Sequence, residues 1–316
     1  MACRRSIAAM LMLGALPAAV SGAPFPERGI SYNPYEAGKP IGAKHKVWLP
    51  GSTYWGEFAT YHGQTDEDHA YNIKIGGFAE ILRIPSIGSF AFLAHTELVA
   101  ARPGDSFFRP RATFWEEGFR FTRRVDDDRY WQLSYMHRCK HDIDNLSTYG
   151  CPADGCERSL IYGSVKGGYA FPVDLCMFGG QTALLSMSAD VFTILQDERV
   201  PPKSAGTTPN MERAWGAIGL KLHVRRPLSG GGFIAVLTGY GSLTMYGEQG
   251  GFFGRFKRAD RGLVDAGIST GIALEGDARL KVGISYEYLA DSGINPEPQA
   301  AHLVSVGVTL MGAGGM

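Results

Sequence analysis

Apolar and polar residues alternate along many segments of this 316-residue chain, and this alternation constrains the fold more than any other feature. Successive side chains of a β-strand point to opposite faces, so a period of two marks a strand with one apolar and one polar face. In one late segment the even positions from Leu280 to Tyr288 are apolar, whereas Arg279, Lys281 and Glu287 are charged. Residues 264–274 and 302–310 repeat the alternation. The pattern predicts an all-β protein.

The connections between these segments indicate which kind of all-β protein it is. Short turns occur at 84–87, 125–128, 171–174, 226–229 and 275–278, and longer links near 100–110, 141–158, 196–212, 247–262 and 290–300. A soluble β-sandwich would also alternate in polarity. Strict alternation of short and long connections, however, is typical of a transmembrane antiparallel β-barrel with short periplasmic turns.

This interpretation predicts about twelve strands, an even number that places both termini in the periplasm. The predicted strands are 52–63, 69–82, 87–99, 111–123, 128–140, 159–170, 174–195, 212–225, 231–246, 262–274, 278–289 and 300–311. Their polar faces would line the lumen with charges of both signs, at Lys74, Glu80, Glu116, Arg120, Lys221, His223, Arg279, Lys281 and Glu287. Twelve strands enclose a modest interior, which such charges would plug or leave narrowly wet. We therefore expect an outer-membrane barrel with a structural or narrow-pore role.

The remaining domain organisation follows from the N-terminus. Arg4 and Arg5 precede an apolar run and then small residues, so we expect 1–23 to be a secretory signal peptide. Residues 24–46 are rich in Pro, Gly and Tyr and should form an extended periplasmic lead-in, followed by one barrel domain over 47–316. The 31 basic and 31 acidic residues balance, which argues against a nucleic-acid partner. The predicted location is the bacterial outer membrane.

Four cysteines follow the predicted signal peptide: Cys139, Cys151, Cys156 and Cys176. An exported protein meets an oxidising compartment, so we expect disulfide bonds. The short loop Cys151-Pro-Ala-Asp-Gly-Cys156 favours a Cys151–Cys156 pair, and a Cys139–Cys156 bridge across a hairpin is the alternative.

The stretch 128–145 is a predicted strand that ends among reactive side chains. Its odd positions begin with Trp131 and Leu133 and finish with His137, Cys139 and His141. In a barrel this face points to lipid, at the outer end of the strand. A histidine lowers the pKa of a neighbouring thiol and takes its proton, so His137 and Cys139 are candidate catalytic residues. Glu157 begins the next strand on the same parity and would orient the imidazole.

These residues resemble the site of the outer-membrane phospholipase A and lipid A deacylase barrels. Those families carry His-x-Ser on a lipid-facing strand end, with Asn or Glu on a neighbouring strand. The matching residues here are His137-Arg138-Cys139 and Glu157, although Cys replaces Ser and Lys140-His141 replaces the usual Asn. The resemblance implies an outer-leaflet lipid acyl hydrolase. The alternatives are a loop anchor held by Cys139 and an exported soluble β-sandwich that binds a ligand.

Three further observations concern ligands and polarity. His141, Asp142 and Asp144 would hold Ca²⁺ if the chain turned at Lys140, and no other cofactor is predicted. Glu117 lies on the apolar parity of its strand, an exception to the pattern. Basic residues in the loop 247–262 suit the phosphates of lipopolysaccharide, and with the apolar outer face they predict membrane lipid and lipopolysaccharide as partners. These basic residues are Arg255, Lys257, Arg258 and Arg261.

Overall fold

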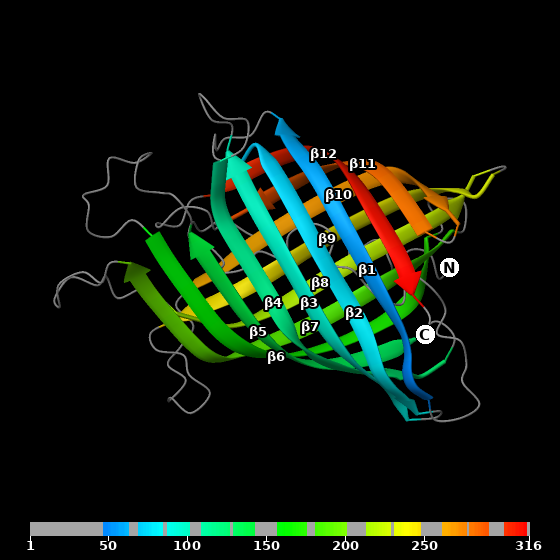
Figure 1. Cartoon of the computed structure of the whole chain (residues 1–316), viewed down its shortest axis with the longest axis horizontal. Helices are drawn as coiled ribbons and strands as arrows, with labels where there is room; N and C mark the ends of the chain where they lie inside the picture. The colour runs from blue at the N-terminus through cyan, green and yellow to red at the C-terminus, as the bar shows by residue number, and fades with distance from the viewer. Residues whose placement is uncertain are drawn as a thin grey trace, which may run out of the picture.

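The computed structural model describes twelve strands that form one closed antiparallel barrel (Figure 1). The described residues are 47–62, 69–84, 87–101, 109–126, 129–142, 157–175, 181–200, 213–228, 231–247, 261–276, 278–290 and 300–314. The strands are β1 (Val47–His62), β2 (Tyr71–Ile84), β3 (Gly88–Ala101), β4 (Arg109–Arg124), β5 (Tyr130–Asp142), β6 (Glu157–Leu175), β7 (Gln181–Val200), β8 (Arg213–Pro227), β9 (Phe233–Gly247), β10 (Arg261–Glu275), β11 (Ala278–Leu289) and β12 (Ala301–Gly314).

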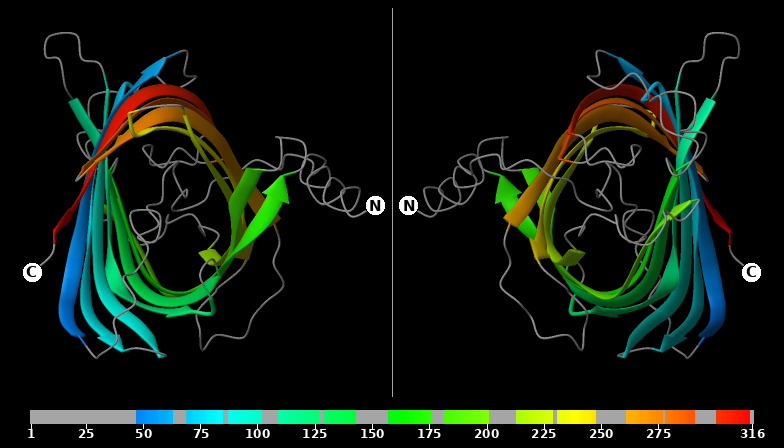
Figure 2. Two further views of the ribbon diagram at one scale, coloured as in Figure 1. Left: turned by 90° about the vertical axis from the view of Figure 1, so that its right-hand side faces the viewer. Right: turned by 90° about the vertical axis from the view of Figure 1, so that its left-hand side faces the viewer.

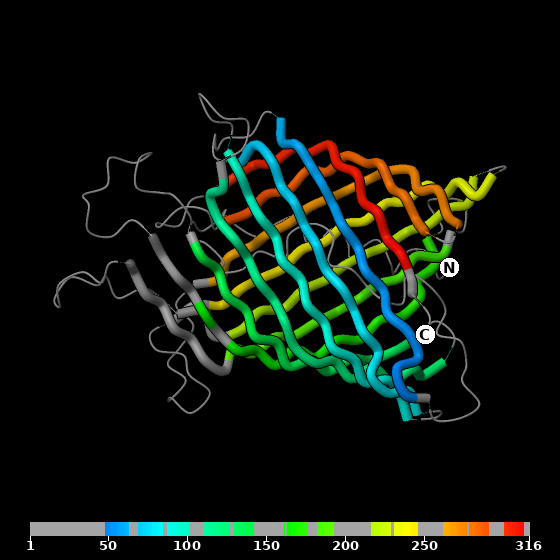
Figure 3. The backbone as a smooth tube through the Cα atoms, in the orientation of Figure 1, coloured from blue at the N-terminus to red at the C-terminus, as the bar shows by residue number. Residues whose placement is uncertain are grey.

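Each strand pairs with its neighbours in sequence, and β1 pairs with β12 to close the sheet. Figure 2 looks along the barrel and shows the wall curving round on itself, and Figure 3 shows that the strands all tilt in the same sense. Within the described part of the chain, no helix is long and apolar enough to cross a membrane. The structure confirms the predicted barrel and strand number, and it rules out the alternative of two packed sheets.

The start of β1 and the end of β12 lie at the same end of the barrel as the short connections. Ser52, near the start of β1, pairs with Gly314 at the end of β12, and Glu275 pairs with Arg279 across a short turn. The strand ends that flank the long connections lie at the other end, as the pairing of His62 with Val304 shows. The periplasmic position of the end with the short turns stays a prediction.

One predicted turn is wrong. Residues 171–174 lie inside β6, where Pro172 pairs with Leu184, and the chain reverses only after Leu175. Proline removes a single N–H donor, so a strand can continue past it when the other backbone groups stay paired. The pairing with β7 continues beyond Pro172, from Val173 opposite Ala183 to Leu175 opposite Gln181.

The two faces of the sheet have opposite polarity. Large apolar side chains are exposed on the outer face, among them Phe58, Phe119, Leu133, Ile268, Val282, Ile284, Val306 and Leu310. Buried polar side chains on the inner face include Asn72, Lys74, Glu97, Ser134, Arg138, Asp190, Asp265 and Glu287. This distribution is the inverse of a soluble protein and confirms the predicted outward faces of β11 and β12.

Two glycines face each other where β10 and β11 pair. Gly271 pairs with Gly283, and a Cβ on Gly271 would lie 2.4 Å from the carbonyl oxygen of Val282. Only glycine leaves room for the two backbones at this distance. These two glycines therefore allow β10 and β11 to pair closely beside the lumen pocket described below.

Candidate functional site

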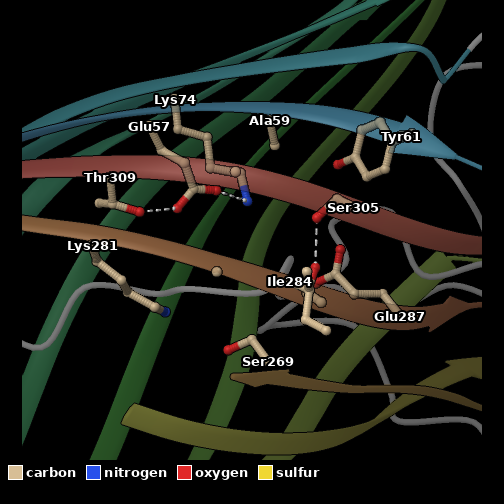
Figure 4. A pocket seen from close by; sticks show the side chains of 13 residues that line it. Glu57, Ala59, Tyr61, Lys74, Ser269, Lys281, Ile284, Glu287, Ser305 and Thr309 are labelled. Carbon is tan, nitrogen blue, oxygen red and sulfur yellow. Dashed lines mark hydrogen bonds and ion pairs between the residues drawn. The ribbon is translucent and has the colours of Figure 1, made fainter. Parts of the chain in front are cut away.

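A pocket opens on the inner wall of β1, β2, β10, β11 and β12 (Figure 4). It encloses about 450 Å³ of space that includes part of the open lumen. Inward-pointing positions of these strands supply nearly all of its lining: Glu57, Ala59, Tyr61, Lys74, Ser269, Lys281, Gly283, Ile284, Ser285, Glu287, Ser305, Gly307 and Thr309. The alternation in the sequence therefore explains why this lining is hydroxyl-rich and charged.

Lys74 lies at the centre of the charges around the pocket. Its Nζ is 3.8 Å from Oε1 of Glu57, and both side chains are largely buried. The hydroxyl of Thr309 donates to Oε2 of Glu57 at 3.0 Å, which holds the carboxylate toward the lysine (Figure 4). The ammonium group also lies in the field of Glu97 and Glu287. Three carboxylates thus surround one ammonium group.

Hydrogen bonds between strands fix the other polar groups near the pocket. The amide of Asn72 donates to Oε1 of Glu97 at 2.6 Å and to the hydroxyl of Tyr61 at 2.9 Å. The hydroxyl of Tyr240 on β9 donates to Glu287 on β11 at 3.0 Å. Asn72 thus links β2 to its two neighbours β1 and β3, and the bond from Tyr240 to Glu287 reaches across β10, so together they hold the inner surface in a defined shape.

The opposite wall carries a second set of charges. The guanidinium of Arg138 on β5 donates to Oδ2 of Asp190 on β7 at 2.9 Å, and its Nε is 3.0 Å from Oε1 of Glu116 on β4. Arg120 donates to the hydroxyl of Ser134 at 3.1 Å. Lys166 pairs across the sheet with Asp190. Ionised groups thus face the lumen on both sides.

A closed sheet with this polar interior and an apolar exterior satisfies its backbone hydrogen bonds internally and can face lipid. The chain is an outer-membrane β-barrel. Its predicted location in the outer membrane follows from the same two observations.

No protein-family model and no curated protein matches the sequence. Similar solved structures include the β domain of the Bordetella autotransporter BrkA, with 16% identity over 83% of this chain and 98% of that one and a TM-score of 0.47. LpxR from Salmonella typhimurium is 7% identical over 82% and 99% of the two chains, with a TM-score of 0.44. The translocator domain of NalP from Neisseria meningitidis is 12% identical over 82% and 88%, with a TM-score of 0.38. With TM-scores below 0.5, the assignment rests on the topology and polarity of the barrel itself.

A second candidate site lies on the lipid-facing side of β4 and β5. Nδ1 of His137 is 3.6 Å from Oε1 of Glu117, and the two side chains are 45% and 43% exposed. Small residues flank the pair, because Ala94 is opposite Glu117 and Gly163 is opposite His137. This environment leaves a polar pair open to the membrane between apolar neighbours.

Cys139 lies two residues beyond His137 on the same outer face. It is a free thiol and only 8% exposed, because it lies between Trp115 on β4 and Ile161 on β6. The alternative bridge from Cys139 to Cys156 is therefore not formed. Cys151, Cys156 and Cys176 lie outside the described residues, so the preferred Cys151–Cys156 pair stays a prediction.

The register places Glu157 away from this pair. Cys139 pairs with Ile161, and Glu157 is four residues farther along β6, which corresponds to about 13 Å of strand. The carboxylate beside His137 is that of Glu117. Glu117 occupies a position of its strand where the alternation calls for an apolar residue. This exception was the sequence signal that could have identified it.

The remaining predicted site residues lie at or beyond the long-loop end of β5. His141 is exposed and pairs with Ser159, whereas only the backbone of Asp142 is described and Asp144 is outside the described residues. Among described residues, no cluster of three or more His, Cys, Asp or Glu side chains is placed to hold a metal ion. The Ca²⁺ site stays a prediction. Arg255, Lys257 and Arg258 also lie outside the described residues, as does the side chain of Arg261, so the lipopolysaccharide contact stays a prediction too.

Proposed function

We propose that the barrel is a narrow pore through which small polar solutes cross the outer membrane. The observation that carries this proposal is the inner wall of ionised and hydroxyl side chains, from Glu57 and Lys74 to Arg138 and Asp190. An interior that only filled space could be apolar, whereas water and polar solutes need hydrogen-bonding groups along their path.

The pairing of these charges supports a narrow pore rather than a wide channel. Most ionised groups described above lie beside a partner of opposite sign, so the field along the lumen is partly cancelled. Twelve strands also enclose far less space than the 16 to 18 strands of general porins. We therefore expect small steady currents.

Planar-bilayer recording of the purified full chain tests the proposal. The expected result is a small, stable conductance whose ion selectivity shifts toward anions in Glu57→Gln, because that change removes a negative charge from the wall. Phe58→Leu is the matched control, since Phe58 is the next residue on β1 and is exposed on the outer face. Large porin-like currents would contradict a narrow pore. Complete absence of current and of solute uptake would leave a structural role.

We propose outer-leaflet lipid acyl hydrolysis as the second candidate function, because His137 lies between two possible partners on the outer face. Oε1 of Glu117 is 3.6 Å from its Nδ1, and Cys139 is two residues farther along β5, opposite Trp115. In this reaction His137 takes the proton of the Cys139 thiol, and the thiolate attacks the ester carbonyl. The alcohol leaves with the proton from His137, and water then hydrolyses the thioester.

Acyl-ester hydrolysis in detergent tests this second function. Cys139→Ala should abolish it, and His137→Ala should cost nearly as much because residues that act as a unit are not additive. Glu117→Gln and Glu157→Gln separate the two candidate acids. Whichever of these two acids orients His137, its variant should hydrolyse the ester more slowly while its folding stays intact. Unchanged hydrolysis in Cys139→Ala would exclude the thiol mechanism.

A further inference from the structure

We infer that the pore selects small zwitterionic solutes, with their cationic end in the pocket on β1, β2, β10, β11 and β12 and their anionic end toward the opposite wall. This inference rests on the proposed pore function. It is carried by the uneven distribution of charge between the two walls and by one buried hydroxyl group in the pocket.

The wall formed by β1, β2, β3, β10 and β11 carries an excess of carboxylates among the described residues. Away from the end with the short turns, the inward-pointing acidic residues are Glu57, Glu97, Asp265 and Glu287, and the basic ones are Lys74 and Lys281. At that end, Glu80 lies beside Arg83 and Glu275 beside Arg279, so the charges there balance. Lys74 already lies beside Glu57. A solute ammonium group entering the pocket would meet more negative than positive charge.

Ser269 is an independent indication of a ligand in this pocket. Its side chain is 7% exposed, and its Oγ has no hydrogen-bond partner within the described part of the chain. It lines the pocket together with Lys281 and Glu287 (Figure 4). Buried hydroxyl groups are nearly always hydrogen-bonded, so a bound donor would complete this one. A solute N–H is such a donor.

The facing wall has the opposite excess. Inward-pointing basic residues of β4 to β8 are Arg120, Arg138, Lys140, Lys166 and Lys221, and the described acidic residues among them are Glu116 and Asp190. In a ring of twelve strands, β6 is six strands from β12 in either direction, so these walls face each other across the lumen.

A transverse field of this kind distinguishes solutes by their charge separation. A zwitterion can turn so that each end faces the wall of opposite sign, whereas a simple cation or anion meets one wall that repels it. A neutral solute of the same size gains neither contact. Zwitterions should therefore cross faster than any of the other three classes.

Liposome swelling with the purified full chain tests this selectivity with two isomers, glycine and glycolamide. They have the same atoms and nearly the same size, but only glycine is a zwitterion at neutral pH. We expect glycine to enter about fivefold faster, which corresponds to about 1 kcal/mol. Ethanolamine and glycolate, the single-charge analogues, should both be slower than glycine.

A matched pair of variants on β10 connects the selectivity to the pocket. Ser269→Ala removes the buried hydroxyl and should lower the glycine rate toward the glycolamide rate. Thr270→Ala alters the next residue, which is exposed on the outer face, and should change neither rate. Swelling by both isomers at equal rates, or a preference for a singly charged analogue, would overturn the inference and leave the pore. No swelling with any solute would overturn the pore itself.

Discussion

The ion pair between Arg138 and Asp190 should hold four neighbouring strands of the barrel together. Arg138 on β5 reaches across β6 to Asp190 on β7 at 2.9 Å and also lies 3.0 Å from Glu116 on β4. The side chains of Arg138 and Asp190 are 8% and 6% exposed. Removing either of them would leave a nearly buried charge without its closest partner.

The structure predicts the order of the losses in stability. Breaking a fully buried pair by removing one partner costs roughly 3–5 kcal/mol. Asp190→Ala should cost about 2 kcal/mol, because Glu116 still compensates the guanidinium. Arg138→Ala should cost about 3 kcal/mol, since two carboxylates then lose their shared cation. Glu116→Ala should cost less than about 1 kcal/mol, because Glu116 is 27% exposed and the buried pair survives.

Urea unfolding of the barrel in phospholipid vesicles measures these differences. A double-mutant cycle of Arg138→Ala and Asp190→Ala should give a coupling free energy of about 1–2 kcal/mol. Ser188→Ala, two residues away on the same face of β7, is the matched control and should change stability little. A coupling near zero, or a larger loss in Glu116→Ala than in Arg138→Ala, would refute the reasoning.

Three other predictions concern the wall of the barrel. His137→Leu leaves the Glu117 carboxylate alone on the lipid face and should lower the free energy of unfolding by about 1–2 kcal/mol, and adding Glu117→Leu should restore it; failure to restore would contradict the pairing. Gly271→Ala places a Cβ 2.4 Å from a backbone oxygen and should cost about 2 kcal/mol, whereas Gly167→Ala, with nothing within 4 Å, should be tolerated; similar losses would argue against the close approach. Cys139 is only 8% exposed, so a lipid-soluble maleimide mapped by mass spectrometry should modify it much faster after unfolding than in the intact barrel; this outcome would count against the hydrolase, whereas fast labelling of the intact barrel would contradict the burial and favour the nucleophile role.

The sequence alone was sufficient for the architecture, because the features that define it are local. A period of two assigns each side chain to a face within a few residues, as in 280–288, and the lengths of the connections separate a barrel from a sandwich. The one wrong turn, at 171–174, came from treating Pro172 as the end of a strand. Its pairing with Leu184 shows that the strand continues.

The neighbours across strands were decided only by the tertiary structure. Moving a strand by two residues keeps every side chain on its face but shifts its partners by about 6.6 Å, so alternation cannot set the register. For this reason the sequence suggested Glu157 as the acid beside His137, whereas the register brings Glu117 there. The same holds in the lumen: Thr309 reaches Glu57 across 252 residues only because β12 closes against β1. Closure of the barrel is a property of the whole sheet, and the charges meet only once it has formed.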